Sequence, residues 1–336
     1  MSEAICRVMR GDLEECTHRG DIAVVDVSGR LIWHWGDPER VTYMRSAAKP
    51  IQVLPVIESG AAEAFGLTER EIAVMCGSHN GEDMHVEAVE GILRKIGLAE
   101  DALGCGTHEP LCRKQAASLI RQGRQPTSIF NNCSGKHSGM LALASYLGLS
   151  RDAYWSKTHP VQSAMKKVVS EMTDYPEERI ILGIDGCGVP VFGLPLKNMA
   201  GAYARLADPS GLSEPRRKAV EYVMRSMARH PEMVAGTGRL CTDLIRATGG
   251  RVIGKLGADG VYCVAVRDHG VGIAMKVEDG NLRAIPPVVI TLLDEMGYLT
   301  GEEARVLEPH RRPPVVNNRG EVVGFIESVV RVERSS

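Results

Sequence analysis

The chain has 336 residues, of which 44% are hydrophobic, 24% charged and 4% aromatic. These fractions are typical of a globular protein and exclude a disordered or collagen-like chain; the length predicts two domains or one large composite. Lys and Arg number 40 against 42 Asp and Glu. The chain therefore has no excess of basic residues, and we expect no nucleic-acid partner. The N-terminus is polar and no apolar stretch could span a bilayer, so we expect a soluble cytoplasmic protein without a membrane partner.

Hydrophobic periodicity predicts strands at both ends of the chain and helices in the middle. A Ser28-Gly29 turn between two β-rich runs predicts a hairpin, and Thr68 with Glu71 forms a capping-box signature at the start of a helix. Helical spacing of apolar residues occurs in 47–60, 68–76, 85–97, 114–122, 137–148, 159–172, 196–207, 214–230 and 286–297. Alternating β-rich runs occur in 251–257, 261–267, 272–278 and 321–333.

Strands at both ends with helices between them predict an α+β protein. We expect one antiparallel sheet built from both termini, with helices and an inserted, mostly helical subdomain. The predicted sheet subdomain comprises residues 1–65 and 248–336, the helical subdomain comprises residues 66–247, and the two form a single composite catalytic unit.

The first chemical motif is an S-x-x-K sequence, in which Ser46 precedes Lys49 at the expected start of a helix. Residues three apart on a helix share a face, so the amine can lie beside the hydroxyl. A lysine activates a serine only when burial or a neighbouring cation keeps its amine neutral. Because the motif is short enough to recur by chance, on its own it is better explained by a serine at a helix start and a solvated lysine.

Two further short motifs follow in the chain. Ser78 and Asn80 form an S-x-N sequence after a predicted helix, and Lys255 with Gly257 forms a K-x-G sequence on a predicted strand. Individually they indicate a helix end and a strand edge. Their order after S-x-x-K is that of active-serine penicilloyl-transfer enzymes, which favours a serine–lysine amidase.

Nine cysteines, an odd number, argue against a disulfide framework in a chain of this length. Most are expected to be small buried residues, but Cys133 lies near Lys136 and His137, and Cys187 near Asp185. Zinc accepts such ligands, although the spacing matches no zinc ribbon or finger. On spacing alone, two buried thiols beside glycine-rich turns explain the pattern better than a metal site does, and a disulfide or redox pair is a further alternative.

Five segments together resemble the Rhizobium etli-type L-asparaginases, also called class 3 or asparaginase II enzymes. The resemblance extends over essentially the whole chain, and the two longest motifs, NNCSGKHSG and GIDGCGVP, are the most specific. It implies a fold like that of serine β-lactamases and glutaminases, hydrolysis of L-asparagine to L-aspartate and ammonia, and a homodimer. The matching segments are MRSAAKPIQ, MCGSHNGE, NNCSGKHSGML, GIDGCGVP and GRLCTD.

The resemblance also assigns site residues. It implies two Ser–Lys tandems, an accessory zinc held by two cysteines and a lysine, and a further group of substrate contacts. The tandems are Ser46 with Lys49 and Ser78 with Lys255; the zinc ligands are Cys133, Lys136 and Cys187; the substrate contacts are Arg45, His79, Asn80, Asn132, His137, Asp185, Gly186 and Cys241.

The mechanism that these assignments favour is covalent. Ser46 attacks the side-chain amide, Lys49 accepts its proton, and Ser78 with Lys255 passes a proton to the leaving ammonia. Zinc then orients the substrate rather than activating water. Three alternatives stay open: Ser78 is the nucleophile, the substrate is glutamine or a β-lactam, or the protein is a non-catalytic amino-acid or zinc sensor.

Overall fold

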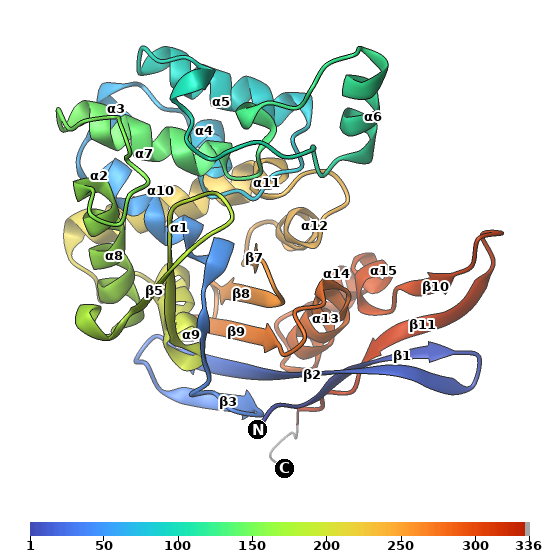
Figure 1. Cartoon of the computed structure of the whole chain (residues 1–336). Helices are drawn as coiled ribbons and strands as arrows, with labels where there is room; N and C mark the ends of the chain where they lie inside the picture. The colour runs from blue at the N-terminus through green and yellow to red at the C-terminus, as the bar shows by residue number, and fades with distance from the viewer. Residues whose placement is uncertain (333–336) are drawn as a thin grey trace.

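The large sheet is built from both ends of the chain. The computed structural model describes residues 1–332. The strands of the large sheet are antiparallel and follow the order β10-β11-β1-β2-β9-β8-β7, with β3 paired to β2 (Figure 1). This confirms the predicted α+β arrangement. The strands are β1 (Glu3–Arg10), β2 (Leu13–Asp26), β3 (Leu31–Trp35), β7 (Val252–Gly257), β8 (Val261–Val266), β9 (Val271–Val277), β10 (Pro314–Val316) and β11 (Val322–Ser328).

The large sheet contains the hairpin predicted from the sequence, and it also contains a pair of strands that are far apart in the chain. β2 and β3 pair antiparallel with Ile22 opposite Trp35, as the Ser-Gly turn predicts, whereas β1 pairs with β11 so that Cys6 faces Ser328. The final strand is shorter than predicted and ends at Ser328; residue 333 of the predicted run lies outside the described residues. Every residue of β8 and β9 is buried, so both faces at the centre of the sheet are covered.

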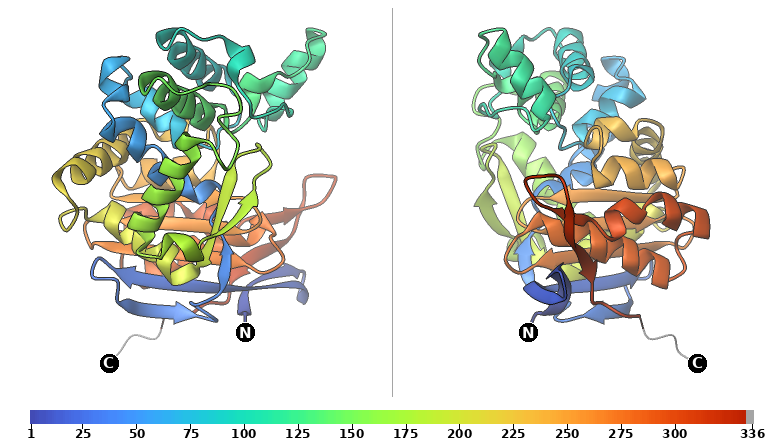
Figure 2. Two further views of the ribbon diagram at one scale, coloured as in Figure 1. Left: turned by 60° about the vertical axis from the view of Figure 1, so that its left-hand side comes forward. Right: turned by 90° about the vertical axis from the view of Figure 1, so that its right-hand side faces the viewer.

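Helices surround this sheet, and the amphipathic segments predicted from the sequence are confirmed as helical (Figure 2). Within residues 1–332, no helix is both long and apolar enough to cross a membrane. The helices are α1 (Lys49–Gln52), α2 (Leu54–Glu58), α3 (Ala61–Ala64), α4 (Glu69–Met75), α5 (Asp83–Lys95), α6 (Arg113–Arg121), α7 (Ser134–Tyr146), α8 (Pro160–Thr173), α9 (Leu196–Ala207), α10 (Glu214–Arg229), α11 (Pro231–Val234), α12 (Leu240–Ala247), α13 (Ile285–Glu295), α14 (Gly301–Val306) and α15 (Glu308–Arg311).

Helix α7 is the buried centre of the helical region. Its residues from Ser134 to Ala144 are all buried, and it packs against α4 and α5. A Cβ atom on Gly135 would lie 2.3 Å from the carbonyl oxygen of Val74 in α4, so a glycine is required for this close approach. Tight packing of α7 against α4 brings the NNCSGKHSG motif beside the segment that carries Ser78.

A second, three-stranded sheet was not predicted. It has the order β4-β6-β5, formed by β4 (Val41–Tyr43), β5 (Ile181–Ile184) and β6 (Pro190–Pro195). Its strands are short; β5 and β6 pair as a local hairpin with Ile184 opposite Pro190, whereas β4 pairs with β6 across about 150 residues, Tyr43 lying opposite Gly193. The sheet joins the segment before Ser46 to the segment that contains Asp185 and Cys187. Helix α9, from the predicted helical segment, packs on β2, β8 and β9 of the large sheet.

Candidate active site

Ser78 lies in an extended segment immediately after helix α4. The predicted capping box starts this helix, because Thr68 and Glu71 exchange side-chain-to-backbone hydrogen bonds, and the helix ends at Met75. The backbone N–H of Ser78 then donates to the carbonyl of Val234, 2.9 Å away. Local capping and one long-range contact therefore fix the position of a serine that is only 7% exposed.

Two lysine amines converge on the hydroxyl of Ser78. The Nζ atom of Lys49 lies 3.1 Å from the Oγ of Ser78, and the Nζ of Lys255, on edge strand β7, lies 2.9 Å from the same oxygen. Lys49 also donates to the carbonyls of Gly77 at 2.6 Å and Asn132 at 3.1 Å. Both lysine side chains are completely buried. The three motifs therefore meet at one hydroxyl, although Lys49 and Lys255 are 206 residues apart in the chain.

The pKa of Lys255 is shifted in the direction that base catalysis requires. Burial, followed by the nearby positive charge of Lys49, lowers the pKa of Lys255 to about 7. Near neutral pH the amine of Lys255 therefore exchanges between its charged and neutral forms. In the neutral form it can accept the proton of the Ser78 hydroxyl, which is already at hydrogen-bond distance.

Ser46 lies at the beginning of the chain's first helical turn, a 3₁₀ turn formed by Arg45–Ala48. It is partly exposed, in contrast to Ser78. Within residues 1–332 its hydroxyl forms no hydrogen bond to another protein group, because the amine of Lys49 is directed to Ser78. The preceding residue, Arg45, has a φ of +49°, a conformation that is unfavourable for residues other than glycine and often occurs at functional sites.

An ion pair holds Arg45 in this conformation. Its guanidinium lies 2.9 Å from a carboxylate oxygen of Asp185 and also contacts Asp259. The backbone N–H of Gly186 donates to the same Asp185 oxygen at 2.9 Å. Three of the predicted substrate contacts, Arg45, Asp185 and Gly186, thus lie together beside Ser46 and present both signs of charge.

The predicted zinc ligands also lie together. Cys133, Lys136 and Cys187 are each at most 5% exposed, and the amine of Lys136 lies 3.1 Å from the sulfur of Cys187. A hydrogen bond from Cys133, with Lys136 nearby, lowers the pKa of Cys187 to about 5. The same bond and burial raise the pKa of Cys133 to about 12. The hydrogen bond between the two cysteines therefore favours a pair that carries one negative charge, which the nearby amine of Lys136 stabilises.

This donor set fits a zinc ion, provided that lysine is the third ligand. Within residues 1–332, no group of three or more His, Cys, Asp and Glu side chains is arranged to hold a metal ion. The two sulfurs and the amine nitrogen nevertheless converge, and sulfur and nitrogen are the donors that zinc prefers. Because Cys187 raises the pKa of Lys136, binding of a metal would have to displace the proton of this amine.

Asn132 connects the two clusters through its backbone. Its carbonyl accepts the hydrogen bond from Lys49, and its N–H donates to the Nε2 atom of His108 at 2.9 Å. The next residue is Cys133. Any movement of this loop would therefore displace the lysine of the first cluster and a cysteine of the second together.

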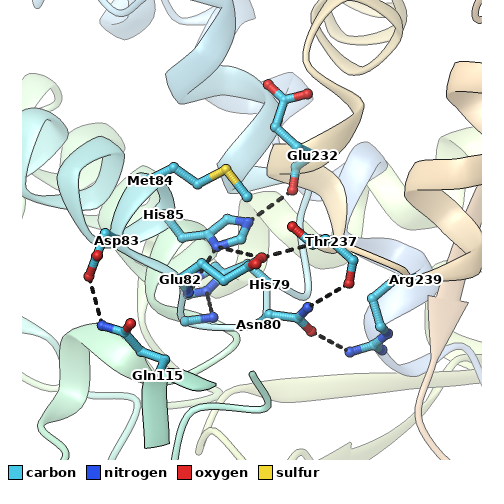
Figure 3. A network of polar contacts seen from close by, with 12 residues as sticks. His79, Asn80, Glu82, Asp83, Met84, His85, Gln115, Glu232, Thr237 and Arg239 are labelled. Carbon is cyan, nitrogen blue, oxygen red and sulfur yellow. Dashed lines mark hydrogen bonds and ion pairs between the residues drawn. The ribbon is translucent and has the colours of Figure 1, made fainter. Parts of the chain in front are cut away.

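His79 and Asn80, assigned to substrate binding by the resemblance, use their side chains in contacts within the protein (Figure 3). The Nε2 of His79 lies 2.9 Å from the hydroxyl of Ser134, and its Nδ1 accepts from the N–H of Gly81. Asn80 receives a 2.8 Å hydrogen bond from Arg239. These contacts hold the Ser78 segment between helix α7 and the loop before α12.

Several residues of this framework were not predicted. His85 bonds to the backbone of Glu82 and Glu232, and Glu82 accepts from the N–H of Thr237, as Figure 3 shows. The sequence offered one signal, the Gly-Thr-Gly turn at 236–238. Cys241 lies nearby on α12, and its sulfur accepts the N–H of Leu256, 3.3 Å away and adjacent to Lys255.

Comparisons with solved structures give remote similarities, with TM-scores of 0.43 or lower. A β-lactamase from Mycobacterium bovis is 12% identical, with 84% of this chain and 95% of that chain covered and a TM-score of 0.43. The protein Mglu in its native form is 17% identical, with 84% and 66% covered and a TM-score of 0.42. A D-alanine carboxypeptidase from Burkholderia cenocepacia is 13% identical, with 87% and 92% covered and a TM-score of 0.37.

No individual curated protein matches the chain significantly. The model of the L-asparaginase II family, in contrast, matches residues 6–328, a range that contains the three serine and lysine motifs and both cysteine motifs. The match therefore covers nearly the whole chain. The chain belongs to the L-asparaginase II family.

Proposed function

We propose that the protein is an L-asparagine amidohydrolase of the Rhizobium etli type, which releases L-aspartate and ammonia. The observation that carries this proposal is the Ser78 hydroxyl, held between the buried amines of Lys49 and Lys255. Membership of the L-asparaginase II family supports an amide substrate. Paired serines and lysines can supply both the nucleophile and the proton transfers that amide hydrolysis needs.

In the proposed mechanism, Ser46 attacks the side-chain amide carbon and its proton passes to Lys49, which transfers a proton through the Ser78 hydroxyl to the neutral amine of Lys255. Ser78 and Lys255 deliver a proton to the amide nitrogen, the C–N bond breaks, and ammonia leaves an acyl-enzyme ester on Ser46. Water then hydrolyses this ester and restores the serine. Ser46 is favoured as the nucleophile because it is partly exposed and follows a strained residue, whereas Ser78 is buried between two amines and is better placed to relay protons.

The charges near Ser46 suit an α-amino acid. Arg45 can pair with the α-carboxylate of asparagine, and Asp185 with its α-ammonium. Both residues already form an ion pair with each other, so the substrate would insert its own two charges between theirs. This arrangement selects a zwitterionic amino acid but does not by itself distinguish asparagine from glutamine, because one methylene changes binding by only about 1–3 kcal/mol.

We further propose that Cys133, Lys136 and Cys187 hold an accessory zinc ion. When bound, zinc would supply a positive charge that orients the substrate, whereas the serine and lysine tandems supply the nucleophile and the proton transfers. Removal of the metal is therefore expected to raise KM by roughly tenfold, because the binding free energy of one charged contact corresponds to about that change. The change in kcat should be smaller. Steady-state kinetics before and after exhaustive chelation measure this.

A variant separates metal binding from turnover. Cys187→Ser is expected to lower the zinc content of the purified protein from about one ion per chain to near zero, because thiolate sulfur is a far better zinc ligand than hydroxyl. Elemental analysis measures the content, and Cys16→Ser, a half-exposed cysteine, serves as control. A turnover that vanishes on chelation and returns with metal would instead favour a metal-bound hydroxide as the nucleophile.

The experiment that tests the proposed function is a direct measurement of ammonia release. Purified protein is supplied with L-asparagine or L-glutamine before and after chelation, and a parallel sample receives the β-lactam nitrocefin, whose ring opening releases no ammonia and is followed by absorbance. Release from asparagine alone supports the proposal; turnover of glutamine or nitrocefin would favour a related amidase. Absence of all three activities in the metal-loaded protein would favour a non-catalytic amino-acid or zinc sensor. A cytoplasmic homodimer remains the expected state of the enzyme.

A further inference from the structure

One polar atom near the site lacks a partner. His137 lies on α7, directly after Lys136, and is completely buried. Its Nδ1 atom lies 2.6 Å from the hydroxyl of Tyr154, whereas its Nε2 atom is buried and forms no hydrogen bond with any other group of residues 1–332. Buried polar atoms are nearly always paired, so an unpaired imidazole nitrogen indicates a missing partner.

The contacts of Tyr154 determine which nitrogen of His137 carries the hydrogen. The backbone N–H of Gly104 donates to the Tyr154 oxygen at 2.8 Å. The hydroxyl has one hydrogen, and within the described residues its remaining contact is the Nδ1 of His137. An Nδ1–H donor would leave the buried hydroxyl hydrogen without an acceptor among the described residues, so the pairing that satisfies Tyr154 has the hydroxyl donating to Nδ1 and the imidazole hydrogen on Nε2. The unpaired atom is consequently a donor.

Packing fixes this relay in place. The ring of Trp155 packs on Gly104 so closely that a Cβ atom there would lie 2.3 Å from the ring. Only a glycine allows the backbone N–H at position 104 to reach Tyr154. The rings of Tyr154 and His137 meet edge to face, with centroids 5.5 Å apart. Gly104, Tyr154 and His137 thus form one rigid chain of hydrogen bonds that ends at the free Nε2–H.

We propose that Tyr154 is a positioning residue that holds His137 as an Nε2–H donor to an oxygen atom of the bound substrate. This inference rests on the proposed function, and it specifies how the site binds its ligand. His137 directly follows Lys136 on α7, and its backbone N–H donates to the carbonyl of Cys133 at 3.0 Å, so it lies next to the cluster of Cys133, Lys136 and Cys187. A carboxylate or amide oxygen can accept from Nε2–H, whereas an ammonium group cannot.

The tautomer can be measured without any activity. Protein labelled with ¹⁵N-histidine is studied by long-range ¹H–¹⁵N correlation spectra, and the His137 signals are assigned as those missing from His137→Gln. The expected result is a neutral ring with its hydrogen on Nε2, and a shift of this Nε2–H signal when L-aspartate, the reaction product, is added. A hydrogen on Nδ1, or an Nε2–H signal that responds to chelation but not to L-aspartate, would overturn the inference.

Variants test the role of the relay. Tyr154→Phe removes the hydroxyl that donates to Nδ1, so we expect a mixture of tautomers and a KM for L-asparagine raised roughly tenfold. His137→Gln keeps an N–H donor near the Nε2 position and should retain more activity than His137→Leu. Tyr222→Phe, which loses a comparable hydroxyl-to-carbonyl bond to Leu67, should leave both the tautomer and KM unchanged.

The outcomes separate this inference from the proposed function. If the protein hydrolyses asparagine but Tyr154→Phe changes neither the tautomer nor KM, the positioning role is wrong and the asparaginase assignment stands. If no ammonia is released from asparagine, the proposed function fails, and the substrate contact of His137 fails with it. The Nε2–H tautomer and its dependence on Tyr154 are then still decided by the spectra alone.

Discussion

Replacement of Ser46 by alanine is expected to lower kcat for L-asparagine by at least roughly 10³-fold, because the variant has no hydroxyl to form the acyl-enzyme. Ser78→Ala should also lose most activity, since Lys49 and Lys255 would no longer share a hydroxyl through which a proton can pass. Ammonia release gives the rates. Hydroxylamine trapping followed by mass spectrometry shows whether an acyl-enzyme forms and on which serine.

The two serines are distinguishable by this design. Ser78→Ala should still form a trace of acyl-enzyme on Ser46, whereas Ser46→Ala should form none. An acyl group on Ser78, together with wild-type turnover by Ser46→Ala, would identify Ser78 as the nucleophile. Ser210→Ala, at an exposed position, is the matched control and should behave as wild type.

Lys255→Met is expected to abolish activity while increasing stability. Its amine is completely buried, and burial with the charge of Lys49 lowers its pKa to about 7. The neutral form needed to accept a proton predominates above that pH, so kcat/KM of the wild-type protein should fall as pH drops below about 7. Methionine fills a similar volume but cannot accept a proton, so turnover should fall by roughly 10³-fold or more.

The stability effect follows from the same pKa. Between about pH 7 and pH 10 Lys255 is neutral in the folded protein but protonated in the unfolded chain, so the unfolded state binds more protons and stability rises with pH. Lys255→Met removes the free-energy cost of keeping this buried amine neutral. The free energy of unfolding of the variant should therefore exceed that of the wild type by up to about 5 kcal/mol at pH 7. Thermal unfolding of both proteins at pH 7 and pH 9 measures the difference.

A suitable control for this experiment is Lys218→Met, which alters an exposed lysine in a surface ion pair. It should change stability little and equally at both pH values. A Lys255→Met protein that is inactive but less stable than wild type at pH 7 would contradict a neutral buried amine. It would indicate that Lys255 contributes a stabilising charge to the fold.

The sequence predicts the parts of the site that lie on regular local patterns. The capping box at Thr68 and the apolar period of α4 predict a helix that ends just before Ser78, and alternation predicts the strand of Lys255. The order of three motifs then predicts that these residues act together. The helix and strand predictions depend on residues within a few positions of one another, where helix and strand geometry decide the outcome, whereas the prediction from motif order rests on the resemblance to active-serine enzymes.

Local sequence patterns do not predict features that depend on contacts between distant parts of the chain. The β4-β6 pairing joins segments about 150 residues apart, and it is this pairing that places Arg45 beside Asp185. The positive φ of Arg45 and the engagement of Asn80 by Arg239 likewise result from tertiary packing. The sequence also points to Lys49 as the base, whereas the pKa shift that favours proton acceptance is found at Lys255, because only the fold brings the two lysines together.

The position of β1 in the large sheet also has a consequence for how the chain is made. Strand β1 is synthesised before the other strands of this sheet, yet one of its two neighbours, β11, is the last of these strands to be synthesised. Until then β1 has an open edge that can pair with another nascent chain. Folding of this sheet must therefore wait until β11 has been synthesised, and a premature stop before Val322 would yield an aggregation-prone product rather than a smaller enzyme.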